Sequence, residues 1–399
     1  MASKILTSYI PELSASIFGR SKPAMVTVNL TSQCNQNCIY CEIGQNHTSP
    51  GREALSFDDI IWILDEMAKN KIKKISLCGG EPFLFEGIID LVAYAAGKNI
   101  RCSITTNGMT AHRLNDSELK ILKESKTEIN ISVDSFRDSI QSYTRGTPAA
   151  LPNVLKSIQK LNQTGIPVTL LTVISKHNYQ DLYKSFTDAY EKGIKQVLFQ
   201  PVIYYSNYPD RNAIDNKSLL NVSADKLDIL MDELQKILRF ERNHPIKTNV
   251  YRIFPWIGHY LKTAASQNGK WFFNDVLDKF YCREIYAIID ISYDGGIQPC
   301  ALTQASISIY KNRHPGLVTL WLKATEEIKD DMLNGRYYNY CNGCCNHFSR
   351  NMLASILKHP LKNRRALFDM MPLLLSRIQA GILKNLYFYR KQTSPANNI

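Results

Sequence analysis

The chain has 399 residues, of which 44% are hydrophobic, so it can form two or three domains with sizeable cores and is not a disordered polypeptide. Its 48 basic and 36 acidic residues give a net charge of +12, which admits nucleic acid, an anionic membrane surface or an anionic small molecule as partner. No apolar run approaches about 18 residues, so we expect no membrane-spanning helix. Ten cysteines without a recognisable secretory leader predict metal ligands in a reducing, cytoplasmic compartment.

Strand and helix patterns alternate from residue 23 to residue 203, after a short lead-in helix that we predict for residues 1–22. We expect strands at 25–30, 73–78, 100–105, 128–134, 167–174 and 195–200. We expect helices near 56–70, 86–97, 116–124, 150–164 and 178–192. Six β/α units predict a parallel sheet covered by helices. They are too few for a closed barrel of eight strands, so the expected α/β fold is a partial (β/α)6 TIM-like barrel with functional residues at the C-terminal strand ends.

Three cysteines follow the first predicted strand at C-x3-C-x2-C spacing: Cys34, Cys38 and Cys41. Three thiolates on one short loop can hold one corner of a metal cluster and leave one coordination position open for chemistry. The alternative is a structural zinc site whose fourth ligand lies elsewhere in the chain.

Polar residues also follow the later strands. Gly79-Gly80-Glu81-Pro82 follows the second strand, and its glycines would let the backbone approach a ligand closely. Thr105-Thr106-Asn107-Gly108 and Ile131-Ser132-Val133-Asp134-Ser135 are polar where a parallel strand would otherwise be apolar. Taken singly, each of these could be an ordinary turn or a solvated strand end.

Together, the cysteine spacing, the aromatic Tyr40 before the third cysteine and the G-G-E-P motif resemble the radical S-adenosylmethionine (SAM) enzymes. The resemblance covers roughly residues 23–350. It implies that the three cysteines hold a [4Fe–4S] cluster whose fourth iron binds SAM. Reduction of SAM by a partner such as flavodoxin or ferredoxin then gives a 5′-deoxyadenosyl radical, which takes hydrogen from an unreactive substrate carbon.

The same resemblance assigns residues to SAM. It implies that Gly79, Gly80 and Glu81 contact the SAM ammonium, that Ser132 and Arg145 hold its carboxylate, that Asn107 and Asp134 contact its ribose or amino-acid part, and that Asn178 and Gln200 contact ribose and adenine. Tyr40 belongs to the same cofactor site. No side chain is nominated as catalytic acid or base.

A second cysteine set begins at residue 281, after a predicted helical connector at 204–280. Residues 285–292 and the return to Cys300 predict a β-hairpin. The set resembles the twitch domain of radical SAM enzymes, a shortened SPASM domain, predicted here at 281–350. This resemblance implies an auxiliary [4Fe–4S] cluster on Cys282, Cys300, Cys341 and Cys344, with structural zinc as the alternative. Cys345 is a spare, either a buried thiol or a replacement ligand for Cys344.

Residues 351–399 hold eight basic residues and one acid, interleaved with large apolar side chains. We predict an amphipathic helix at about 373–390 in this basic tail. It could lie on an anionic membrane surface, which would favour a peripheral location and a lipid or lipid-linked substrate. Alternatively, its apolar stripe packs against the rest of the protein.

These patterns predict a radical SAM enzyme that acts on a non-peptide substrate, possible classes being lipid, lipid-linked molecule and sugar, with oxidation, bond formation or rearrangement as the outcome. A peptide-modifying maturase is the first alternative; the short lead-in, which has no room for a peptide-binding domain, disfavours it. A zinc-stabilised nucleic-acid-binding protein is the second. It would explain the charge but not the ordered motifs.

Overall fold

The computed structural model describes residues 23–41, 55–202, 220–264, 281–301, 303, 305, 307–310, 313–334, 336, 341, 344 and 351–368. The helices predicted within residues 1–22 and 373–390 lie outside the described residues, as does Cys345. Within the described residues, no helix is long and apolar enough to cross a membrane.

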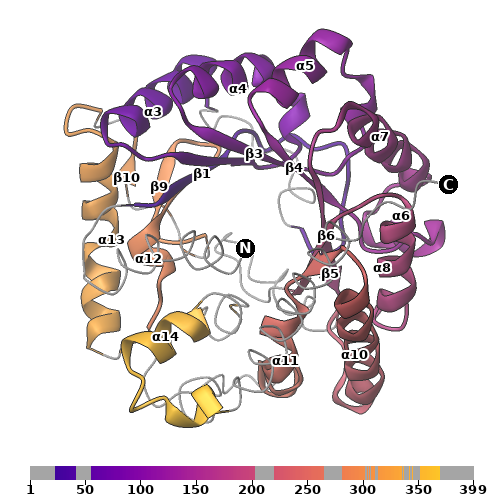
Figure 1. Cartoon of the computed structure of the whole chain (residues 1–399). Helices are drawn as coiled ribbons and strands as arrows, with labels where there is room; N and C mark the ends of the chain where they lie inside the picture. Colours follow the sequence, from indigo (N-terminus) through magenta and orange to yellow (C-terminus); the bar gives the residue numbers. More distant parts are fainter. Residues whose placement is uncertain are drawn as a thin grey trace, which may run out of the picture.

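One ten-stranded sheet organises the molecule, in the order β10-β9-β8-β1-β2-β3-β4-β5-β6-β7. The strands from β8 through β7 in this order run parallel, and β9 and β10 pair in antiparallel fashion at one edge. In chain order, the first six strands are β1 (Met25–Asn29), β2 (Lys74–Cys78), β3 (Arg101–Thr106), β4 (Glu128–Ser132), β5 (Val168–Ile174) and β6 (Gln196–Pro201). They confirm the six predicted strands. Figure 1 shows the sheet curving around the centre of the molecule with helices outside it.

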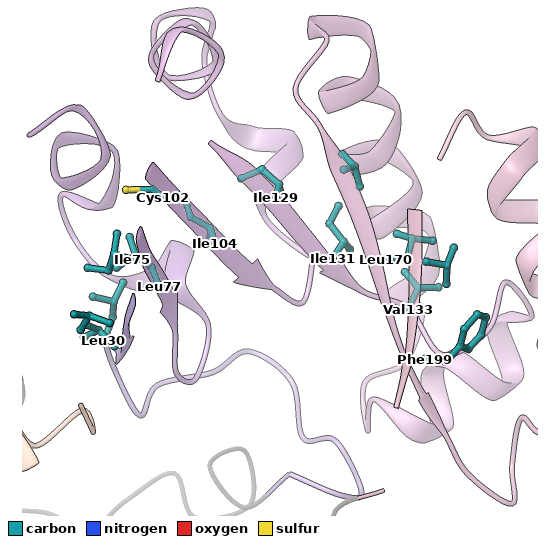
Figure 2. Close-up of a cluster of buried hydrophobic side chains, with 14 of the residues drawn as sticks. Leu30, Ile75, Leu77, Cys102, Ile104, Ile129, Ile131, Val133, Leu170 and Phe199 are labelled. Atoms are coloured by element: carbon teal, nitrogen blue, oxygen red, sulfur yellow. The ribbon is translucent and has the colours of Figure 1, made fainter. Parts of the chain in front are cut away.

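The outer face of the sheet forms the core because alternate residues of each strand are aliphatic. Leu77, Ile104, Ile129 and Leu170 are each at most 1% exposed, and Figure 2 shows such side chains along neighbouring strands. They pack against helices as one cluster of buried residues. Burial of each large aliphatic side chain contributes about 1.5–3 kcal/mol.

The helices between the strands are amphipathic, and most lie where the sequence predicts them. They are α3 (Phe57–Lys69), α4 (Ile88–Gly97), α5 (Asp116–Glu124), α6 (Asp138–Thr144), α7 (Ala150–Thr164) and α8 (Leu182–Glu191). Ser56 and Asn115 begin α3 and α5 with capping boxes. The prediction omitted α6. This two-turn helix ends at Arg145, which is its C-cap.

The C-terminal part of the chain extends the same sheet. β8 (Ile288–Ile291) runs parallel to β1, and β9 (Gly296–Gln298) returns beside it as the predicted hairpin. The start of the hairpin was wrong by a few residues, because Glu284–Ala287 forms one helical turn, α12. The other elements of this half are β7 (Lys247–Thr248), β10 (Ile307–Ser308), α10 (Leu227–Asn243), α11 (Val250–Ala264), α13 (Leu317–Leu333) and α14 (Met352–Lys358).

Candidate functional site

The cysteine loop, residues 31–41, leaves the C-terminal end of β1 and is fixed on two sides by backbone hydrogen bonds. On one side the amides of Gly80 and Glu81 donate to the carbonyls of Thr31 and Gln33, at 2.6 and 2.7 Å. On the other, the amides of Asn37 and Ile39 donate to the carbonyls of Arg145 and Thr144, at 3.2 and 3.0 Å. The G-G-E-P turn and the end of α6 therefore hold the loop between them.

Glycine is required where these segments meet. A Cβ atom on Gly80 would lie 1.9 Å from the Gln33 carbonyl oxygen, and one on Gly146 would lie 1.9 Å from that of Asn37. Gly79 has φ +125°, which L side chains rarely adopt, and its added Cβ would lie 2.7 Å from the Thr31 oxygen. The sequence predicts that Gly79 and Gly80 approach a ligand closely, and that stays a prediction. In the structure both glycines approach the cysteine loop closely.

Glu81 is fully buried and ties β2 to the end of β3. Its carboxylate accepts hydrogen bonds from the Thr106 hydroxyl at 2.6 Å, the Asn107 amide at 2.8 Å and the Phe83 amide at 3.2 Å. Burial raises the pKa of Glu81, and these donors oppose the rise. The predicted contact with the SAM ammonium stays a prediction, but the structure gives this carboxylate a positioning task that the sequence did not reveal.

Asp134 is the centre of a second buried network. One of its oxygens accepts from the Arg145 guanidinium at 2.8 Å and from the Val173 amide at 3.0 Å, and the other accepts from the Tyr40 hydroxyl. The guanidinium also lies over the Tyr40 ring, 5.5 Å from its centroid. Burial would lower the pKa of Arg145, but the negative charges of Asp134, Tyr40 and Cys38 together outweigh it, so the pKa is raised and the guanidinium stays charged. Burial raises the pKa of Tyr40 well above its ordinary value.

The two networks reach the thiols. Asn107 Nδ2 lies 3.8 Å from Cys34 Sγ, and Arg145 Nη1 lies 4.0 Å from Cys38 Sγ. Burial raises the pKa of Cys34, and it raises that of Cys38 to about 11 although Arg145 opposes the rise. A Cys41 thiolate would raise both pKa values further, so the loop favours three thiolates only when cations neutralise them.

These residues fit an iron–sulfur cluster. Three thiols share one loop, and amide and guanidinium donors lie beside two of them. Arg145 Nε and Gln36 Nε2 are buried donors without a hydrogen-bond partner among the residues that the structure describes, so the site has hydrogen-bonding capacity left for a bound group. Within the described residues, no three His, Cys, Asp or Glu side chains converge as they would around a single metal ion. A cluster does not need that convergence, because each cysteine binds a different iron.

The other predicted SAM contacts lie near this loop or farther along the same sheet edge. Asn178 is buried, and its side-chain amide donates to the carbonyls of Asp134 and Val173 at 2.9 and 2.8 Å. It therefore joins the ends of β4 and β5. The Ser132 carbonyl accepts from the Gln141 amide at 3.4 Å, and the Gln200 side chain is exposed near the end of β6. The predicted SAM contacts of these three residues stay predictions.

The sheet face opposite the helices, here called the inner face, is polar on four strands. Thr27, Ser76 and Ser103 are in register on β1, β2 and β3, and each is half-buried. Thr105 and Asn130 form the next row, joined by a hydrogen bond of 3.4 Å. The inner face thus offers hydroxyl and amide groups below the cysteine loop.

The second cysteine set converges only in part. Cys282, Cys300 and Cys341 share a small cluster with the apolar side chains of Ile285, Ile328, Met332 and Tyr286. Cys344 is joined to Cys341 by a backbone hydrogen bond of 3.2 Å. Burial raises the pKa of Cys282 well above its ordinary value, and the nearby carboxylate of Glu284 raises it further. Asn351 Nδ2 lies 3.7 Å from the Cys282 sulfur.

The sequence of residues 28–189 matches the model of the radical SAM superfamily. This segment is a radical SAM domain. It contains the cysteine loop, Glu81, Asn107 and the Asp134 network, so the match to the superfamily and the geometry above concern the same part of the chain. The superfamily implies a [4Fe–4S] cluster and SAM as cofactors.

Two curated relatives show how far the similarity extends. The chain is 26% identical over 220 residues to Fe-coproporphyrin III synthase of Methanosarcina barkeri, covering 55% of this chain and 54% of the relative. It is 33% identical over 186 residues to GTP 3',8-cyclase of Listeria welshimeri, covering 44% of this chain and 54% of the relative. The chain spans about half the length of these relatives.

A solved structure supports the fold over a longer stretch than the radical SAM domain. SuiB of Streptococcus suis, bound to S-adenosylmethionine, matches with a TM-score of 0.57 and 18% sequence identity, covering 77% of this chain and 68% of SuiB. At this identity the likeness concerns the fold alone. The predicted partial barrel is confirmed.

Proposed function

We propose that the protein is an enzyme that cleaves SAM reductively and removes a hydrogen atom from an unreactive carbon of its substrate. The observation that carries the proposal is the cysteine loop, held at the C-terminal strand edge by the G-G-E-P turn and by Arg145 within a radical SAM domain. When bound, the cluster and SAM supply the electron transfer and the radical chemistry.

The residues of the chain bind, orient and shield. Cys34, Cys38 and Cys41 hold the cluster, while the glycine contacts fix the loop that carries them. The Asp134 network keeps Arg145 charged and buried beside Cys38. There its Nε, which has no hydrogen-bond partner among the described residues, can bind the SAM carboxylate. The sheet covers the site from below and excludes water on that side.

Anaerobic reconstitution with iron and sulfide tests this proposal. The protein should turn brown, contain iron and sulfide, and release 5′-deoxyadenosine from SAM once dithionite reduces it. A protein that binds zinc and no iron under these conditions would refute the proposal. Iron bound without any SAM cleavage would restrict the first site to electron transfer.

We assign the second cysteine set to an auxiliary [4Fe–4S] cluster on Cys282, Cys300, Cys341 and Cys344. The shared apolar cluster supports this assignment because burial beside apolar side chains shields iron–sulfur clusters from solvent. An auxiliary cluster could accept the second electron if the substrate is oxidised. Metal analysis decides between iron and zinc at this site.

For the substrate, we propose a non-peptide molecule that presents hydroxyl groups, such as a sugar. The inner face supports this choice, since its rows of Thr, Ser and Asn side chains can donate and accept hydrogen bonds without carrying charge. The alternative is a peptide substrate. Deuterium transfer into 5′-deoxyadenosine from perdeuterated sugars, compared with perdeuterated peptides, separates the two, and transfer from a peptide alone would reject the sugar.

The start of the basic tail supports a more specific proposal, that the substrate is linked to a lipid and that the protein binds it at a membrane surface. Leu361 and Phe368 are 87% and 71% exposed, and residues 351–368 contain basic but no acidic side chains. Each basic residue near an anionic surface contributes about 1 kcal/mol. The full chain should float with anionic liposomes at low salt, and L361D/F368D should float less. Leu322→Asp, at another exposed leucine on α13, is the control. Equal flotation of both variants would reject the proposal that Leu361 and Phe368 contact the membrane surface.

A further inference from the structure

Two of the three thiols in the cysteine loop face a side-chain hydrogen-bond donor from a neighbouring strand end or helix end. Asn107, after β3, directs its amide to Cys34 Sγ at 3.8 Å. Arg145, at the end of α6, directs its guanidinium to Cys38 Sγ at 4.0 Å. Hydrogen bonds to cluster sulfurs are among the features that set reduction potentials.

Each donor is held in place by a different buried carboxylate. The Glu81 carboxylate accepts the backbone amide of Asn107 at 2.8 Å, and the Asn107 side chain also donates to Asn35 Oδ1 at 2.6 Å. The Asp134 carboxylate forms an ion pair with Arg145 at 2.8 Å, in which both side chains are at most 6% exposed. The donors are therefore fixed before any cofactor binds.

The two donors and the carboxylates that hold them, here called the Asn107 arm and the Arg145 arm, differ in charge. The arm through Asn107 presents a neutral amide to its thiol. The arm through Arg145 presents a cation whose charge is offset by Asp134, and Asp134 is in turn moderated by the Tyr40 hydroxyl that donates to it. Removing the Asn107 donor should therefore make the electrostatic potential at the cluster more negative, whereas removing the Asp134 charge, which offsets Arg145, should make it more positive.

We propose that Asn107 and Arg145 set the reduction potential of the cluster bound by Cys34, Cys38 and Cys41, with Glu81 and Asp134 as positioning residues. The inference rests on the proposed function. One-electron reduction adds one negative charge to the cluster, and the electron comes from a low-potential one-electron donor protein. Donors beside the sulfurs stabilise the more negative state, so they raise the potential.

The test is an EPR-monitored redox titration of the reconstituted full chain without SAM. In Asn107→Leu one donor is lost, so the equilibrium constant for reduction should fall about tenfold, which corresponds to about 59 mV towards negative potential. In Asp134→Asn the Arg145 charge is no longer offset, so the potential should move in the positive direction. Asn162→Leu, at the C-terminal end of α7 with its side-chain amide on the Lys192 carbonyl, should leave the potential unchanged.

Opposite shifts in the two variants support the inference. Unchanged potentials, or shifts in the same direction, overturn it, provided that iron content and thermal unfolding match the wild type. If Asp134→Asn does not hold iron, Tyr40→Phe replaces it. Loss of the hydroxyl leaves Asp134 more negative, so the potential should then fall, and no shift would overturn the Arg145 arm. A wild type without an EPR signal would instead refute the proposed function, which keeps the two failures distinct.

Discussion

The two cysteine sites of this chain differ in the charged and polar groups that surround their thiols. Around the first loop, a buried cation, Arg145, lies beside Cys38, and two buried carboxylates fix the neighbouring donors. Around the second set, Cys282 accepts from the neutral amide of Asn351, and the charge that most affects it is the Glu284 carboxylate. A cation near cluster sulfurs favours the reduced state, whereas burial and a carboxylate oppose it.

The difference extends to how each site is held. The first loop is held by backbone hydrogen bonds to the G-G-E-P turn after β2 and to the end of α6, and glycines lie at both contacts. In the second set, apolar contacts bring together the single helical turn α12, Cys300 at the end of the hairpin, and Cys341, which lies about 40 residues farther along the chain. We therefore expect the first site to be rigid before metal binds, and the second to depend more on its metal for its shape.

The largest effect is expected from substitutions that disrupt the first site alone. Cys34→Ala, Cys38→Ala or Cys41→Ala should each abolish formation of 5′-deoxyadenosine, because each removes one iron ligand. Product is measured by chromatography after anaerobic reduction with SAM. Cys102→Ala is the control, since this thiol lies in the hydrophobic core among the helices and should leave product formation intact. Cleavage of SAM by any of the three loop variants would reject the assignment of the loop.

The same comparison shows what the sequence could and could not predict. The six strands and the position of Cys34, Glu81 and Asp134 at one sheet edge followed from periodicity, because parallel strands bring their C-terminal ends together. The helix α6 was missed because its seven residues include one aliphatic side chain, Ile140, and so give no clear apolar stripe.

The sequence could not predict which side chains would form hydrogen bonds with one another. The link from Glu81 to Asn107, and that from Asp134 to Tyr40 and Arg145, join residues 26, 94 and 11 positions apart. Such pairings depend on strand register and on the path of α6, neither of which the residue pattern specifies. The spacing of Cys282 and Cys300 indicated a second site, but not that its hairpin would extend the sheet of the barrel beside β1.

The next effect separates the two sites by metal content. With two [4Fe–4S] clusters the wild type should hold about eight irons, and Cys282→Ala should reduce this towards about four. Because the first loop keeps its own clamps, SAM cleavage should persist in the variant. Iron is measured colorimetrically and zinc by mass spectrometry. About four irons and one zinc in the wild type would make the second site structural, and loss of all iron in Cys282→Ala would show that the sites do not fold independently.

Stability should respond more strongly at the charged site. Arg145→Ala leaves the Asp134 carboxylate buried without its cation, and breaking a buried ion pair in this way costs about 3–5 kcal/mol. Urea unfolding of the metal-free protein measures the change. Lys98→Ala removes the partner of Asp65 in an exposed, solvent-screened pair and should leave stability nearly unchanged. Similar losses in the two variants would contradict the view that the first site depends on a buried charge network.

The smallest effect tests the neutral partner at the second site. Asn351 is fully buried, and its oxygen accepts from the Arg283 amide at 2.8 Å while its amide faces Cys282. Asn351→Ala would remove this buried hydrogen bond, which costs about 1–3 kcal/mol, less than the loss of Arg145. Asn334→Ala, at the exposed end of α13, should change stability by less than about 0.5 kcal/mol. If Asn351→Ala destabilised the protein as much as Arg145→Ala, the second site would be held as firmly as the first, and the contrast between a preformed site and one shaped by its metal would no longer stand.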